Sequence, residues 1–114
     1  ANSDKKYSRA KSYSKTAISL NGRKGSYYIL LANIYAAAPN WSDKAELNPC
    51  KYYAVLDKLA RAKSVDESVA AEANRLIGIY SQHTPDPANL FFLGIKQGDT
   101  VHVGGLIDED VTIR

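Results

Sequence analysis

An apolar pattern of helical spacing recurs along this chain at one constant distance, and this repetition constrains the fold more than any other feature. The first copy consists of Tyr28, Leu31, Ala32 and Tyr35, and the second of Ala73, Leu76, Ile77 and Tyr80. A second set of positions shows the same shift of 45 residues, from Tyr7, Ala10 and Ala17 to Tyr52, Val55 and Ala62. Because two different helices are displaced by one offset, the sequence predicts stacked helical repeats. Such stacks usually present surfaces that bind other proteins.

Apolar periodicity predicts four helices before residue 84. They cover residues 4–20, residues 26–38, the segment from Pro49 or Cys50 to Lys63, and residues 67–82. The first helix is expected to bury Tyr7, Ala10, Tyr13 or Ser14, Ala17 and Leu20. Ser3 or Asp4 would cap this helix and Asp66 the fourth one, because short polar side chains accept hydrogen bonds from the first backbone amides. Residues 39–49 are interpreted as an inserted loop in which residues 43–47 can form one helical turn.

The pattern changes after Pro87, where alternation replaces helical spacing. Residues 90–93 form a short apolar cluster, and residues 100–103 and 111–114 alternate between polar and apolar side chains. Asp108, Glu109 and Asp110 lie between these two segments and are interpreted as the turn of a β-hairpin. We expect this hairpin to cover the open end of the helical stack, because the last unit of a repeat array exposes apolar surface. The predicted domains are helical repeats over residues 1–87, about two units with the first incomplete, and a C-terminal extension over residues 88–114.

The repeated residues resemble the tetratricopeptide repeat family. Its unit of 34 residues carries W-x₂-L-G-x₂-Y on the first helix and A-x₃-F, then Ala and Pro, on the second. Tyr28, Leu31, Ala32 and Tyr35 resemble the first-helix signature, and Ala10, Ala17, Ile18 and Leu20 resemble the second-helix signature. The observed spacing exceeds the family's unit by about eleven residues, which corresponds to the inserted loop. The resemblance implies a mainly α fold, an antiparallel helical repeat of the α–α superhelix type.

The tail, from Phe91 to Arg114, is similar to the C-terminal ends of some tetratricopeptide-type proteins of Gram-negative gut bacteria. Many of those proteins carry export signals. This similarity implies the C-terminal part of a longer protein, with further repeats before Ala1 and a periplasmic or cell-envelope location. The residues themselves leave the compartment open, and a cytoplasmic location remains an alternative. A first helix without its repeat partner would expose an apolar stripe, through which the chain could self-associate.

The resemblance also implies a binding groove lined by the first helix of each unit. Its lining residues would be Ser26, Ile29, Asn33 and Ala36. Asn33 follows the small residue of the signature, a place where the family often has an asparagine that holds a peptide backbone or carboxylate. The alternative is that Asn33 is a polar surface residue bonded to a neighbouring turn. Trp41, in the inserted loop, either fills a gap between helices or serves as an exposed aromatic anchor for a partner.

Charge is unevenly distributed along the chain, whose net charge is +3. A basic patch on the first helix consists of Lys5, Lys6, Arg9, Lys11 and Lys15. The patch is interpreted as a solvated helix face, a docking patch for an acidic partner or nucleic acid, or a head-to-tail contact between chains. Nucleic acid is disfavoured, because the basic residues are not part of a groove-reading motif.

Catalytic and metal-binding patterns are not found in the sequence. Cys50 is the single cysteine and is expected to be a small buried hydrophobe, and His83 and His102 lack the context of a metal motif. No apolar run approaches the length of about 18 residues that spans a membrane. The sequence therefore predicts a protein–protein interaction or scaffolding module without catalysis, cofactor or metal. Two alternatives remain: a structural end-cap or self-association segment, and a weak nucleic-acid or acidic-partner binder that uses the basic first helix.

Overall fold

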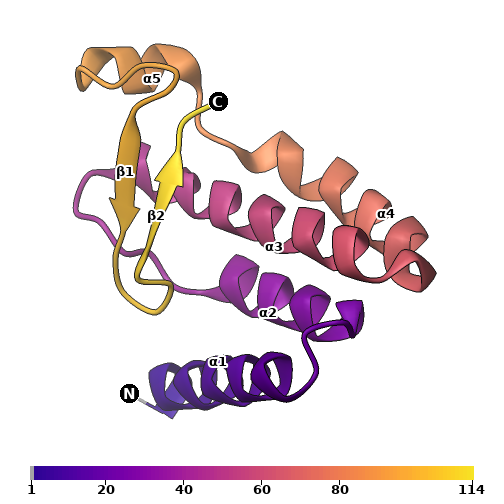
Figure 1. Ribbon diagram of the computed structural model, residues 1–114. Helices are drawn as coiled ribbons and strands as arrows, with labels where there is room; N and C mark the ends of the chain where they lie inside the picture. The colour runs from indigo at the N-terminus through magenta and orange to yellow at the C-terminus, as the bar shows by residue number, and fades with distance from the viewer. Residues whose placement is uncertain (1) are drawn as a thin grey trace.

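The four longest helices are stacked side by side in chain order, and a small β-hairpin lies across one side of the stack (Figure 1). The structure is a computed structural model that describes residues 2–114, with side chains from Lys5 onward. The α-helices are α1 (Asn2–Leu20), α2 (Gly25–Ala37), α3 (Lys51–Val65), α4 (Ala70–Tyr80) and α5 (Pro87–Phe92). Short 3₁₀ helices are η1 (Ala45–Cys50), η2 (Glu67–Val69) and η3 (Ser81–His83), and the strands are β1 (Thr100–Val103) and β2 (Glu109–Thr112). The chain is thus mainly helical with one antiparallel hairpin.

Local sequence patterns account for the bounds of the helices. α1, α2 and α3 match the predicted helices to within a few residues, whereas the predicted fourth helix is divided into η2, α4 and η3. Asp66 caps this last segment as expected, because its carboxylate accepts a hydrogen bond from the Ser68 amide at 3.1 Å. The predicted cap of α1 at Ser3 or Asp4 concerns side chains outside the described ones.

α1 buries a narrow stripe of small residues against α2 and exposes mostly polar side chains together with Tyr13 and Leu20. Ser14 is fully buried, and its hydroxyl donates a hydrogen bond to the Ala10 carbonyl at 2.9 Å. Tyr13 is 70% exposed and Leu20 is 83% exposed, so the prediction that Leu20 is buried is wrong. The physical reason is that small side chains let two helices approach closely, and the larger neighbours are then excluded from the contact.

Both copies of the recurring apolar pattern contribute to the core around α3. Leu31 and Tyr35 on α2 are buried against α3, and Leu76 on α4 is buried on its opposite side. Val55 and Leu59 of α3 complete this core and are fully buried. Leu31 of the first copy and Leu76 of the second copy therefore both face inward.

The hairpin belongs to the same core as the helices. β1 and β2 pair with Val101 opposite Val111 and Val103 opposite Glu109. Val103 and Val111 are buried in one continuous cluster with Leu31 and Leu59 of the helices. β2 lies on α3 rather than beyond α4, so the expectation that the hairpin covers the open end of the stack is wrong. Inward-facing valines require an apolar surface, and the side of the stack next to α3 supplies it.

Two further differences from prediction lie in the C-terminal region. The hairpin turn is formed by residues 104–108, and Glu109 and Asp110 belong to β2 instead of the turn. Gly105 has a φ of 64°, which suits a turn residue without a side chain. The apolar cluster at residues 90–93 lies mostly in α5, which Asp86 caps by accepting a hydrogen bond from the Ala88 amide at 2.9 Å. Within the described residues, the helices are all too short or too polar to cross a membrane.

Candidate functional site

The four residues predicted to line a groove lie together on one face of α2. Ser26, Ile29, Asn33 and Ala36 follow the spacing of three and four residues that aligns side chains along a helix. Ser26 and Asn33 are exposed, whereas Ile29 and Ala36 are half-buried against the core. The face therefore alternates polar and apolar positions along its length.

Asn33 is connected to α4 and to a group of aromatic rings. The Tyr80 hydroxyl donates a hydrogen bond to Asn33 Oδ1 at 2.9 Å. The Tyr80 ring stacks on Tyr52 with ring centroids 6.0 Å apart, and the Tyr52 ring lies 5.3 Å from that of His83. Of the two sequence-based interpretations of Asn33, the alternative in which it is bonded to a neighbouring turn does not hold, because its partner is a side chain 47 positions away in the chain. We call this region, the α2 face together with Tyr52, Tyr80 and His83, the Asn33–Tyr80 surface.

Lys51, the first residue of α3, places positive charge at the C-terminal end of α2 beside this surface. Lys51 Nζ donates hydrogen bonds to the carbonyls of Ala36 at 3.0 Å and Ala38 at 2.7 Å, which lie at the C-terminal end of the helix. A cation is favourable there, because the last carbonyls of a helix have no amide partner. Burial lowers the pKa of Lys51. Lys51 and Tyr52 also line a neighbouring pocket of about 300 Å³ together with Asn40, Ala45, Asn48 and Pro49.

Trp41 lies apart from the α2 face. Its ring is half-buried, and Nε1 donates a hydrogen bond to the Asn48 carbonyl at 3.3 Å. Trp41 also lies against the hairpin turn, because a Cβ atom added to Gly105 would be 3.3 Å from the Cβ atom of Trp41. The side chain thus fills a gap between the inserted loop and the hairpin, and the structure does not bring it together with Asn33.

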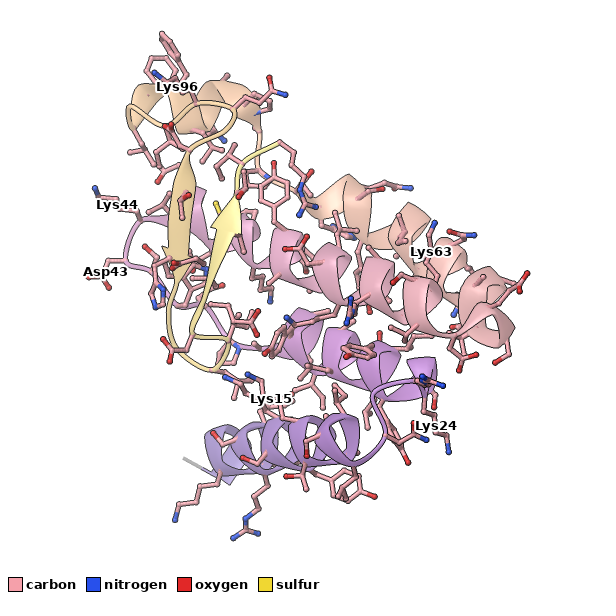
Figure 2. All side chains as sticks on the ribbon, viewed as in Figure 1. Lys15, Lys24, Asp43, Lys44, Lys63 and Lys96 are labelled. Atoms are coloured by element: carbon pink, nitrogen blue, oxygen red, sulfur yellow. The ribbon has the colours of Figure 1, made fainter. Side chains whose placement is uncertain are left out.

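Two residues of the predicted basic patch contact the hairpin, and the other three are exposed to solvent. Lys11 Nζ donates hydrogen bonds to the carbonyls of Leu106 at 2.7 Å and Ile107 at 2.9 Å in the hairpin turn. Figure 2 shows Lys15 on the side of α1 that faces the hairpin, and its Nζ lies 3.9 Å from Glu109. The remaining members, Lys5, Lys6 and Arg9, are exposed. Burial, followed by the charge of Lys15, lowers the pKa of Lys11.

Glu109 is the residue that sequence reasoning missed. Its carboxylate accepts hydrogen bonds from the Tyr35 hydroxyl at 2.5 Å and from Lys58 Nζ at 2.7 Å. Two lysines approach the Tyr35 ring, with Lys11 Nζ 5.8 Å and Lys58 Nζ 5.9 Å from the ring centroid. Alternation provides the signal that could have found Glu109, because it shares a strand face with buried Val111, two positions later. We call Tyr35, Lys58 and Glu109 the Glu109 cluster.

The charge state of the Glu109 cluster follows from its surroundings. Burial alone would raise the pKa of Glu109, but the hydrogen bonds from Lys58 and Tyr35 and the charges of Lys58 and Lys15 lower it overall. Burial, with the hydrogen bond to Glu109, raises the pKa of Tyr35. At neutral pH the cluster therefore holds a carboxylate and a protonated phenol, an arrangement that fixes the hairpin to α2 and α3.

Burial accounts for the protonation of Cys50, and two neighbouring carboxylates hold His102. Burial raises the pKa of the Cys50 thiol to about 11, so the thiol is protonated at neutral pH. His102 lies on the outer face of the hairpin, 2.7 Å from Asp110 and 2.9 Å from Asp108. Among the described residues, no three His, Cys, Asp or Glu side chains are close enough to hold a metal ion.

The Asn33–Tyr80 surface combines several kinds of binding group. It offers the side-chain amide of Asn33, three aromatic rings and half-buried apolar side chains. These groups suit the recognition of an extended polypeptide, which presents carbonyl oxygens and side chains in alternation. In comparisons with known proteins, no family model, curated protein or solved structure matches this chain.

Proposed function

We propose that this chain is a non-catalytic protein-interaction module of tetratricopeptide-like helical-repeat type. The observation that carries the proposal is the exposed amide of Asn33, held by Tyr80 on a surface that α2 and α4 share. An amide fixed in this way loses little conformational entropy when it binds a partner, which favours its use as a recognition group.

The repeat character is supported by full or partial burial at positions separated by the constant offset. Leu31 and Leu76 are both buried, and Tyr7 and Tyr52, in the other helix type, are both half-buried. Helices α1 to α4 also contact their neighbours in chain order, as successive helices of a repeat array do. The insertion of η1 and its flanking loop between α2 and α3 accounts for a spacing longer than the family's 34 residues.

A bound segment would use the surface in three ways. Asn33 Nδ2 is available to donate to a backbone carbonyl of the partner, a hydrogen bond worth about 1 kcal/mol. The Tyr52 and His83 rings offer aromatic contacts for a side chain, and Ile29 supplies an aliphatic contact. Lys51 adds positive charge beside these groups, which suits a partner with a nearby carboxylate.

A site-specific cross-linking experiment tests the proposal. A photoreactive residue is placed at Ser26, exposed on the α2 face, and in a second protein at Ser12, exposed on the outer face of α1. Both proteins are irradiated in lysate of the producing cells, and the cross-linked partners are identified by mass spectrometry. We expect a discrete protein partner from Ser26 only, which Asn33→Ala weakens by about tenfold.

The matched control is Asn74→Ala, because Asn74 is an exposed asparagine of α4 whose side chain contacts Lys63 instead of α2. This variant should retain the partner. Equal losses in the two asparagine variants would refute a specific role for the Asn33–Tyr80 surface. Capture of salt-sensitive nucleic acid through Lys5, Lys6 and Arg9 would support the basic first helix as the binding element instead.

A further inference from the structure

A concave surface lies at the opposite end of the hairpin from its turn. It is a cleft of about 320 Å³ between α5, the start of α3 and the last residues of the chain. Its apolar walls are formed by Tyr53, Pro85, Pro87, Leu90, Ile95 and Ile113. This volume is at the lower end of the range of ligand and anchor-residue pockets, about 300–1,000 Å³. The cleft is separate from the Asn33–Tyr80 surface and shares no lining residue with it.

α5 exposes two large aromatic side chains next to this cleft. Leu90 points into the core, whereas Phe91 is 75% exposed and Phe92 is 86% exposed. Their rings contact each other edge to face with centroids 6.5 Å apart, and Phe91 also lines the cleft. Leaving two large apolar rings in water is unfavourable, because burying apolar surface lowers the free energy. The core of the described chain does not use either ring, and the apolar surface therefore extends from the cleft onto α5.

The charged side chains that line the cleft are cationic. They belong to Lys96 and Arg114, and the neutral Gln97 is part of the same lining. Arg114 is paired with Asp57 and lies 5.4 Å from the centre of the Tyr53 ring.

Lys96 lies beside α5 in Figure 2 and has no ion-pair partner among the side chains that the structure describes. The Asp99 carboxylate accepts a hydrogen bond from the Lys96 backbone amide at 3.0 Å, but it forms no ion pair with the Lys96 ammonium. An apolar cleft with such a lysine at its edge is complementary to an apolar group that is followed by a negative charge.

We propose that this cleft docks an acidic peptide segment of a partner protein. A bulky apolar side chain of the segment occupies the cleft beside Phe91, and a neighbouring carboxylate pairs with Lys96. A peptide explains the extension of the apolar surface onto Phe92, because a small molecule that fills the cleft would leave this ring in water. A membrane surface is disfavoured, since lipid binding uses clusters of about 4–8 basic residues and the cleft has a single unpaired one.

A titration with defined peptides tests this proposal on the complete chain. The probe is a short fluorescein-labelled peptide in which glutamates flank a central Leu-Phe pair. Two control peptides replace the glutamates by lysines or the Leu-Phe pair by serines. Binding is followed by fluorescence anisotropy, and the site is mapped from methyl chemical shifts of Leu90, Ile95 and Ile113. We expect saturable binding of the acidic apolar peptide only, with shift changes at these three residues.

Substitutions then separate the apolar from the electrostatic contribution. Phe91→Ser should weaken binding about tenfold, and Lys96→Glu about threefold with reduced sensitivity to salt. The matched control is Lys63→Glu, an equal charge change at an exposed lysine on α3, which should alter affinity by less than about twofold. Because Phe91 and Lys96 are exposed, circular dichroism of both variants should match that of the parent chain.

Several results would overturn the proposal. One is the absence of saturable binding of the acidic apolar peptide. Others are equal binding of the lysine peptide, unchanged affinity in Phe91→Ser, or shift changes confined to the Asn33–Tyr80 surface. Sedimentation of the chain with phosphatidylserine vesicles in a Phe91-dependent manner would assign the surface to membranes. A dimer that Phe91→Ser dissociates would assign it to a second copy.

Discussion

Replacement of Glu109 by alanine should destabilise the protein far more than replacement of its neighbour on the same strand. Glu109→Ala leaves the buried hydroxyl of Tyr35 and the ammonium of Lys58 without their shared acceptor. Side chains of Lys58 and Glu109 are only 21% and 24% exposed, so water replaces the lost contacts incompletely. A hydrogen bond to a charged group contributes about 1.5–3 kcal/mol, and the partly screened ion pair adds up to about 1 kcal/mol. We expect the free energy of unfolding to fall by about 2–4 kcal/mol.

Asp110→Ala is the matched control for this experiment. Asp110 follows Glu109 in β2, but its side chain is 67% exposed and pairs with His102 on the outer face. Loss of such an exposed pair should cost less than about 1 kcal/mol. Both variants are measured by urea denaturation followed by circular dichroism, with the slope compared to ensure that the same surface unfolds. A loss of stability below about 0.5 kcal/mol in Glu109→Ala, or equal losses in the two variants, would refute the reasoning.

The same cluster predicts how stability depends on pH. The pKa of Glu109 is lowered in the folded protein relative to its ordinary value of 4.5. Its stabilising contribution is therefore present above the unfolded pKa, near 4.5, and is lost as the pH falls through the folded pKa. The stability difference between the parent chain and Glu109→Gln should accordingly be largest near neutral pH and decrease below pH 4.5. A difference that stays constant in acid would contradict the assigned charge state.

Three further outcomes follow from particular residues. Gly25→Ala should lower the free energy of unfolding by about 1–3 kcal/mol, because a Cβ there would lie 2.5 Å from a valine methyl and 2.8 Å from a backbone carbonyl. Gly78→Ala should instead raise the free energy of unfolding by about 0.5–1 kcal/mol, because a Cβ at this position of α4 meets nothing within 4 Å. Both changes are measured by thermal unfolding. The hydrogen bond to Asp110 raises the pKa of His102 above its ordinary value of 6.5. The stabilisation from this pair is therefore complete below pH 6.5 and is lost as the pH rises through the pKa of the folded protein. An NMR titration should show a lower pKa of His102 in Asp110→Asn. The Cys50 thiol, with a pKa of about 11, should react with thiol reagents only on unfolding, and fast reaction of the native chain would contradict its burial.

Local patterns were sufficient to predict most of the secondary structure. The bounds of α1, α2 and α3 follow apolar periodicity, and the Asp66 cap and the hairpin follow from short motifs. These features depend on hydrogen bonds and burial between residues close in the chain, which a sequence window contains. α5 escaped prediction because its six residues are too few to show a helical period.

Features formed by residues close in the chain could be predicted from the sequence, whereas contacts between residues far apart in the chain were decided by the tertiary structure alone. The sequence alone determined a helical stack with a recurring inward face, the grouping of Ser26, Ile29, Asn33 and Ala36, and the presence of a hairpin. The tertiary structure decided that Tyr80 holds Asn33, that Lys11 binds the hairpin turn, and that Glu109 joins β2 to α2 and α3. The partners in these contacts are 47 to 95 positions apart. Periodicity reports which face of an element is buried, but a charged or polar side chain receives its role from whichever distant element the fold places against it.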